Sequence, residues 1–145
     1  MRNRHALRWL AGAMFAAGVC GANFAVAADS AAKDRYDQAE KVAEAEYEAA
    51  RARCDDLSDN AKKVCIEEAK GNEKVAKKNA EAEYKGTPDA RYDAEVAKAD
   101  VAYSVAKQRC EDRKGNDKEI CVKDAKAAQT RAMRDAKDVK AHSGK

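Results

Sequence analysis

Four cysteines at a repeated spacing are the residues of this chain best suited to covalent chemistry. Ten residues separate Cys54 from Cys65, and the same spacing separates Cys110 from Cys121. A fifth cysteine, Cys20, lies in a segment that we expect to be removed on export. An even number of cysteines in an exported chain favours disulfide bonds. Other possible chemistries for such cysteines are thiol-disulfide exchange and zinc binding.

Neither of these other chemistries fits the spacing well. Dithiol oxidoreductases carry two cysteines much closer together, and zinc sites draw on clustered cysteines and histidines. His142 is the only histidine outside the N-terminal segment, and it lies in the C-terminal tail. Acidic runs such as Glu67-Glu68 suit a solvated helix face with ion pairs one turn apart. We therefore expect structural disulfides, no metal, no cofactor and no catalytic residue.

The N-terminal segment has the three parts of a secretory signal peptide. Residues 1–8 contain three arginines and no acid, residues 9–19 are uncharged and apolar, and residues 25–27 form a small-x-small cleavage site. The apolar run is about half of the roughly 20 residues that a membrane span needs. We expect removal of residues 1–27, localisation in the periplasm, and no stable membrane span in the mature chain.

Charge argues against a nucleic-acid-binding protein. The chain has 29 basic and 26 acidic residues, and three of the bases are the arginines of the signal peptide, so the mature chain has 26 of each. Nucleic-acid binding needs an excess of basic residues on one face. Residues 28–86 carry 15 acids and 12 bases, whereas residues 87–145 carry 11 acids and 14 bases. This opposite charge would favour docking of the two halves or head-to-tail association.

The two halves are a tandem repeat with an offset of 56 residues and no gap. This offset superimposes both cysteines and two tyrosines of each half: Tyr36 on Tyr92, Tyr47 on Tyr103, Cys54 on Cys110 and Cys65 on Cys121. Such self-similarity indicates duplication of one supersecondary unit. We place hairpin repeat 1 at residues 28–86 and hairpin repeat 2 at residues 87–145.

Apolar residues recur every three or four positions, which is the spacing of one helix face. This pattern predicts four helices, covering approximately residues 36–54, 61–84, 92–110 and 121–139. Polar segments at 55–60 and 111–116 predict the turns inside the repeats. Gly71 interrupts the second helix, but Ala127 at the equivalent position favours a continuous helix.

Helix-end residues support these boundaries. Thr87 is placed to cap the third helix, and Pro88 suits the first helical position because its missing N–H needs no partner there. Gly115 followed by Asn116 has the pattern of a helix-ending glycine and an N-cap. The sequence thus predicts an all-α fold of two antiparallel helical hairpins.

Hairpin geometry selects the disulfide pairing. Cys54 lies about one turn before the first loop and Cys65 slightly more than one turn after it, so the two lie at similar height along adjacent helices. Neighbouring alanines permit the approach of about 5.5 to 6 Å between Cα atoms that a disulfide requires. The same argument pairs Cys110 with Cys121. Each bridge should stabilise its hairpin by about 3 kcal/mol.

The expected core is poor in large apolar residues. The mature chain has no Phe or Trp, and alanine buries little area per residue. We expect the four tyrosines at repeated positions to supply the large core contacts: Tyr36, Tyr47, Tyr92 and Tyr103. Their alternative role is a stacking surface for a ligand. Hairpins of this composition should depend on their disulfides.

The pattern Tyr-x10-Tyr-x6-Cys-x10-Cys, with Asn-x-Lys before the second cysteine and Ala-Lys after it, resembles that of a group of small exported proteins. These Ala/Lys-rich proteins occur in Burkholderia-type proteobacteria, and some are named for likeness to TolA or for cell envelope biogenesis. The resemblance covers nearly the whole mature chain. It implies export and repeated helical hairpins, but no biochemical activity, because none is defined for that group.

These features favour a non-enzymatic periplasmic protein with a structural or interaction role in the cell envelope. Its partner would be an envelope protein or a second copy of the chain. A stress-type chaperone or ion-binding protein is the alternative, and a thiol-disulfide redox protein is a more distant one.

Overall fold

A computed structural model describes residues 22–143 of the chain. Within this range it contains helices and no strand. The elements are α1 (Ala22–Arg53), a short 3-10 turn η1 (Cys54–Asp56), α2 (Asp59–Lys85), α3 (Pro88–Cys110) and α4 (Gly115–Ser143). The predicted all-α fold of two disulfide-stapled antiparallel hairpins is confirmed. Hairpin 1 consists of α1 and α2, and hairpin 2 of α3 and α4.

The expected signal peptide lies mostly outside the described residues. Only its last part, residues 22–27, falls in α1. Removal of residues 1–27 would therefore shorten α1 at its free end and leave the segment that packs on α2.

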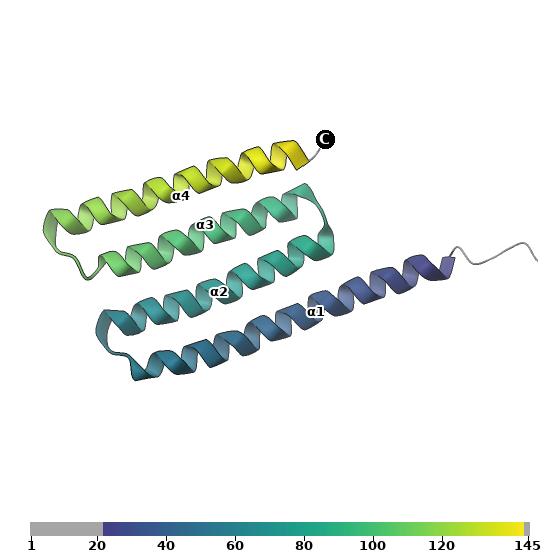
Figure 1. Ribbon diagram of the computed structural model, residues 1–145, viewed down its shortest axis with the longest axis horizontal. Coiled ribbons are helices and arrows are strands. Elements are labelled where there is room, and N and C mark those ends of the chain that lie inside the picture. The colour runs from purple at the N-terminus through teal and green to yellow at the C-terminus, as the bar shows by residue number, and fades with distance from the viewer. Residues whose placement is uncertain (1–21, 144–145) are drawn as a thin grey trace, which may run out of the picture.

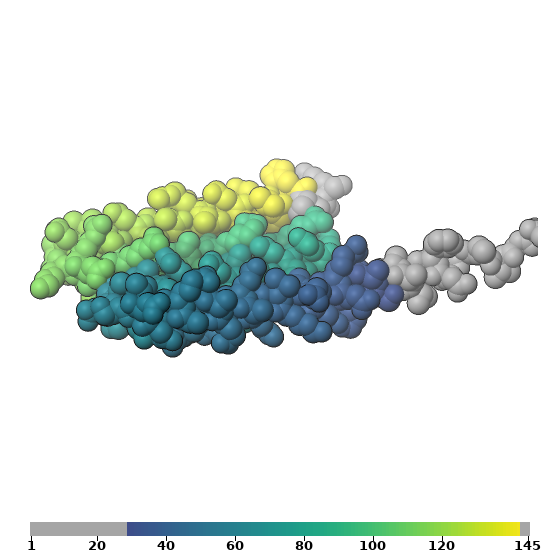
Figure 2. Space-filling view, turned by 60° about the horizontal axis from the view of Figure 1, so that its bottom comes forward, coloured from purple at the N-terminus to yellow at the C-terminus, as the bar shows by residue number. Residues whose placement is uncertain are grey.

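The four helices form a single serpentine layer (Figure 1). Each helix lies beside the next one along the chain, and across residues 22–143 the helix α1 contacts neither α3 nor α4. Figure 2 shows α1 in blue along one side of this layer and α4 in yellow and green along the other. The fold is therefore an open array and not a closed four-helix bundle.

Alanine dominates the buried positions between helices. Ala43 and Ala99, which are equivalent in the repeat, are 2% and 4% exposed, and the equivalent Ala80 and Ala136 are 8% and 2% exposed. Small side chains allow helices to pack closely. They also remove little apolar surface from water, so each contact contributes little free energy. The layer therefore relies on close helix approach and on its covalent links.

The connection between the hairpins has the predicted capping. The Thr87 hydroxyl oxygen accepts a hydrogen bond of 3.2 Å from the backbone N–H of Ala90, and Pro88 is the first residue of α3. This cap satisfies one of the N–H groups that a helix start leaves unpaired.

The loop before α4 differs from the expectation. The helix α3 already ends at Cys110, and Gly115 begins α4 with a left-handed φ of 55°. Gly115 thus starts a helix instead of ending one. Asp59, its equivalent in hairpin 1, begins α2 with a similar φ of 50°. Both loops enter their second helix through one left-handed residue, a conformation that glycine adopts without strain.

Candidate functional site

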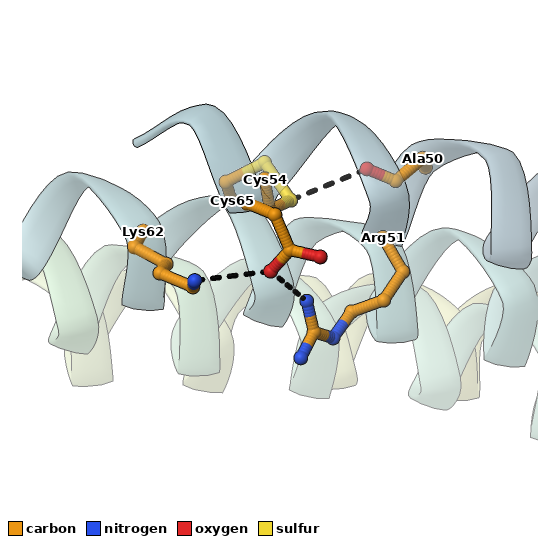
Figure 3. The surroundings of a disulfide bond; sticks show 6 residues. Ala50, Arg51, Cys54, Lys62 and Cys65 are labelled. Carbon is orange, nitrogen blue, oxygen red and sulfur yellow. Dashed lines mark hydrogen bonds and ion pairs between the residues drawn. A yellow bond between two sulfur atoms is a disulfide. The ribbon is translucent and has the colours of Figure 1, made fainter. Parts of the chain in front are cut away.

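The first disulfide lies at the loop end of hairpin 1. Cys54 and Cys65 are bonded, with their Cα atoms 5.6 Å apart, and Cys54 is fully buried. Figure 3 shows this bond beside Ala50. The Cys54 Sγ atom lies 3.3 Å from the Ala50 carbonyl oxygen. Because a disulfide sulfur carries no proton, we treat this approach as a packing contact.

The second disulfide repeats this arrangement in hairpin 2. Cys110 and Cys121 are bonded, their Cα atoms are 5.8 Å apart, and Cys110 is 1% exposed. The predicted pairing within each hairpin is confirmed. Both disulfides lie at the same end of the layer, because they flank the two loops inside the hairpins (Figure 1).

An acidic side chain joins the two helices next to each disulfide. The Asp55 carboxylate contacts Arg51 at the end of α1 and Lys62 in α2, each at 3.0 Å (Figure 3). Hydrogen bonding to Lys62 and then to Arg51 lowers the pKa of Asp55. In hairpin 2 the equivalent Glu111 pairs with Lys118 at 2.6 Å. These pairs supplement the covalent link, although exposed ion pairs contribute little individually.

The tyrosines at repeated positions line the helix interfaces but are not enclosed. All four are half-buried: Tyr36, Tyr47, Tyr92 and Tyr103. The buried positions among the described residues belong mainly to alanine and cysteine, with Gly71 and Gln129 besides. The tyrosines therefore lie over the margins of the interfaces, and the alanines fill the space between the helix backbones.

Tyr36 has the most defined surroundings of the four. Its ring stacks on Tyr84 of α2 with centroids 5.2 Å apart, and its hydroxyl donates a 2.8 Å hydrogen bond to Glu40. That hydrogen bond raises the pKa of Tyr36. Arg35 and Glu83 border the groove beside the two rings. Tyr84 is not one of the four tyrosines at repeated positions, because its equivalent in hairpin 2 is Lys140.

The junction between the hairpins is the contact that sequence analysis missed. Gly71 of α2 is buried against Val101 of α3, and a Cβ atom at position 71 would overlap Val101 Cγ1. The glycine therefore allows close approach of the two hairpins, and α2 remains continuous through it.

Polar contacts extend this junction toward the loops. The Asn60 amide donates a 2.9 Å hydrogen bond to the Gln108 backbone carbonyl, and the Gln108 amide donates one of 2.6 Å back to Asn60 Oδ1. Further along, Ser104 donates a hydrogen bond to Glu67. An ion pair between α2 and α3 joins Glu68 to Arg109.

One sequence signal could have located the junction. Gly71, Val101 and Gln108 all break the repeat, since their equivalents are alanines at positions 127, 45 and 52. When several equivalent positions hold different residues in two otherwise similar repeats, those positions are candidates for contacts between the repeats, because the two repeats use different helices in such a contact.

Two further findings concern metals and membranes. Among the described residues, no group of three or more His, Cys, Asp or Glu side chains could hold a metal ion. Across residues 22–143, no helix combines the length and apolar composition needed to cross a membrane.

Comparison with known proteins gives no assignment. No protein-family model, no curated protein and no solved structure matches this chain.

Proposed function

We propose that this protein is an exported, non-enzymatic structural or interaction protein of the bacterial periplasm, which presents a disulfide-tied layer of helices to the cell envelope. The observation that carries the proposal is the open single layer. Each helix is buried along its sides only, so both broad surfaces and the outer sides of α1 and α4 stay accessible to a partner.

The disulfides support an oxidising compartment. Disulfides persist in secreted and periplasmic proteins and are rare in the cytosol. The signal-like segment at residues 1–27 and the resemblance to small exported Ala/Lys-rich proteins point the same way.

Burial of one cysteine in each disulfide favours a structural role for the cysteines over redox catalysis. A redox-active cysteine must be accessible to the thiolate that attacks it. Cys54 and Cys110 are 0% and 1% exposed, and their partners are half-buried. We expect both disulfides to have reduction potentials below about −300 mV, as structural disulfides do.

Export and partner capture test this function. The tagged full-length chain should appear in the periplasmic fraction with residues 1–27 removed and no free thiol, as intact mass and thiol labelling would show. A variant with Ala25→Arg and Ala27→Arg should remain unprocessed and serves as the control. A cytosolic, reduced product would overturn the proposal.

The partner is addressed by photo-crosslinking in intact cells. A photoreactive residue at Val42, which is 44% exposed on α1, should capture an envelope component or a second copy of the chain. The same residue at Ala97, which is 3% exposed, is the matched control and should capture neither. Equal capture from both positions would contradict a specific interaction surface.

A further inference from the structure

The outer helices expose faces that their repeat equivalents bury. The offset of 56 residues relates α1 to α3 and α4 to α2. Inside the molecule, α2 packs against α3. The outer face of α1, defined as the equivalents of the α3 contact residues, comprises Ala45, Glu48, Ala52 and Arg53. The outer face of α4 comprises the equivalents of the α2 contact residues, Asn116, Lys123, Asp124 and Ala127, together with Ile120, which lies between Asn116 and Lys123 on the same helix face. All nine residues are exposed.

The small residues of these two faces are compatible with one another. At the internal junction, Gly71 is required because Val101 occupies the space of its missing Cβ atom. At the equivalent positions, α4 has Ala127 and α1 has Ala45. Alanine at both positions replaces the glycine and valine of the internal junction. Because alanine has no Cγ atom, the overlap with a Cβ atom on the facing helix does not arise. The outer faces can therefore approach as closely as the internal ones.

Charge at the first polar contact is complementary. The internal junction joins Ser104 of α3 to Glu67 of α2 through a hydrogen bond. The equivalent positions are Glu48 on α1 and Lys123 on α4. A hydrogen bond from a hydroxyl to a carboxylate inside the molecule thus corresponds to a pair of opposite charges between the outer faces.

The second polar contact combines the same two kinds of charged group at the internal junction and on the outer faces. Arg109 of α3 pairs with Glu68 of α2 inside the molecule. The equivalents are Arg53 on α1 and Asp124 on α4, which again combine a guanidinium with a carboxylate. Two successive positions therefore favour the approach of α4 to α1.

Exposed apolar surface and overall charge act in the same direction. Ile120 of α4 is 46% exposed, whereas its equivalent Val64 is half-buried and lies four residues after Asn60 and three before Glu67, on the same face of α2. Residues 28–86 have three more acids than bases, and residues 87–145 have three more bases than acids. Opposite charge on the two surfaces steers their association.

The helix ends away from the loops oppose the contact. Ala82, Ala90 and Ala94 form a buried cluster at the internal junction. The equivalent of Ala82 is Asp138 and that of Ala90 is Asp34, so two carboxylates would face each other. Association between the outer faces is therefore centred on the loop end and is weaker than the internal junction.

We propose that a second copy of this chain docks its α1 outer face on the α4 outer face of the first, so that the array of helices continues head to tail. Such a contact is heterologous and leaves a free face at each end, which allows chains of more than two copies. The inference rests on the proposed structural role, for which it names the chain itself as a partner.

Sedimentation velocity of the oxidised chain, residues 28–145, tests the proposal. At low ionic strength the weight-average mass should rise with protein concentration from the micromolar to the millimolar range. At about 0.5 M salt this rise should diminish, because screening weakens contacts between exposed charges. A monomer throughout this range would overturn the proposal.

Charge reversal identifies the faces involved. Glu48→Lys or Lys123→Glu alone should raise the dissociation constant about tenfold, a change that corresponds to 1.4 kcal/mol. The two reversals together should restore it to within about threefold of the original value. Asp112→Lys, which lies in the exposed loop between α3 and α4 and changes the net charge by the same amount as Glu48→Lys, should have little effect. Equal effects of all three single variants would assign the association to net charge and contradict docking by these faces.

Failure of this inference is separable from failure of the proposed function. A monomeric chain that is still exported and still captures another envelope component would overturn head-to-tail docking alone. A chain that self-associates in solution but remains in the cytosol would overturn the proposed function alone. Circular dichroism of each variant, with unchanged helicity, would show that the charge reversals leave the fold intact.

Discussion

Hairpins 1 and 2 have the same arrangement of two antiparallel helices and one disulfide, but different side chains stabilise the two helix pairs. In hairpin 1 the Tyr36 ring stacks on Tyr84, with centroids 5.2 Å apart. At the equivalent place in hairpin 2, the Lys140 ammonium lies 5.1 Å from the centroid of the Tyr92 ring. An aromatic stack and a cation–π contact therefore occupy the same position on the two helix pairs.

A second contact differs in the same way. In hairpin 1, Lys77 bridges Glu44 of α1 and Glu73 of α2, at 2.9 Å from each. In hairpin 2 the equivalents of the two acids bond directly, because the Gln129 amide donates a 2.7 Å hydrogen bond to Asp100. Replacing one carboxylate by an amide removes the need for a bridging cation.

The comparison separates positions that fix the geometry from positions that tolerate change. Both hairpins keep the cysteines and two buried alanine positions, Ala43 with its equivalent Ala99 and Ala80 with its equivalent Ala136, and these small or bonded residues determine how closely the helices approach. The two half-exposed contacts described above differ between the hairpins, but in each hairpin the side chains still have a partner across the interface. The hairpins should therefore respond alike to loss of a disulfide and differently to changes at these paired positions.

The largest expected effect is the loss of a disulfide. Replacing Cys54 and Cys65 by alanine, or Cys110 and Cys121, should lower the free energy of unfolding by about 3 kcal/mol in each case. The two losses should be similar because both loops have a sequence separation of 11. Urea unfolding followed by circular dichroism measures both. A loss below about 1 kcal/mol for either pair would contradict dependence on the bridges.

The next effect concerns the close approach at Gly71. Gly71→Ala should lower the free energy of unfolding by about 1 kcal/mol, because overpacking against Val101 outweighs the gain in helix propensity. Adding Val101→Ala should recover most of this loss by copying the alanine pair of the outer faces. Ala127→Gly, the opposite change in hairpin 2, should also cost about 1 kcal/mol through lost propensity. Urea denaturation would detect both, and a stabilising Gly71→Ala would contradict the overlap.

The left-handed residue at the start of each second helix gives a related test. Gly115→Ala should cost about 1 kcal/mol, because a Cβ atom is strained at the φ of 55° found there. Gly115→Asp, which copies Asp59 of hairpin 1, should cost less, since aspartate tolerates this conformation better than alanine does. Thermal unfolding ranks the two variants. The reverse order would show that the φ angle is not what selects glycine.

The bridging lysine offers a smaller effect. Lys77→Met, which copies Met133 of hairpin 2, leaves Glu44 and Glu73 without their shared cation and should lower the melting temperature less than Gly71→Ala does. Adding Glu73→Gln, which copies Gln129, should restore it. If the second change lowers stability further, the two hairpins do not use equivalent contacts here.

The smallest effect is a difference in acid sensitivity. Hydrogen bonds from Lys78 and then Lys85 lower the pKa of Glu81 to about 2. A carboxylate with a depressed pKa stabilises the fold above its ordinary pKa, and this contribution disappears as the pH falls from about 4.5 to about 2. Lysine occupies the equivalent position 137 of hairpin 2, so hairpin 1 alone has this contribution. Glu81→Gln should flatten the loss of stability over this range in acid titration followed by circular dichroism. An unchanged titration would contradict it.

Periodicity and capping signals predict most of the local structure. The spacing of alanines predicts four helices, and Thr87 with Pro88 predicts where α3 begins, because these signals act over one or two helical turns. The same short-range signals do not predict the backbone conformation of the loops. The left-handed start of α4 at Gly115 depends on how the loop meets the disulfide-tied helix pair, and residue type alone suggested a helix end there.

The sequence by itself determined the helices, the hairpins and the disulfide pairing of this protein. Each follows from contacts within about 50 residues, and the repeat makes each prediction twice. Only the tertiary structure decided that the hairpins lie side by side as an open layer, joined by Gly71, Val101 and the Asn60–Gln108 hydrogen bonds. The physical reason is that alanine-lined helices can pack on several sides with similar energy. The close approach at one glycine and a few directed polar contacts then select one arrangement.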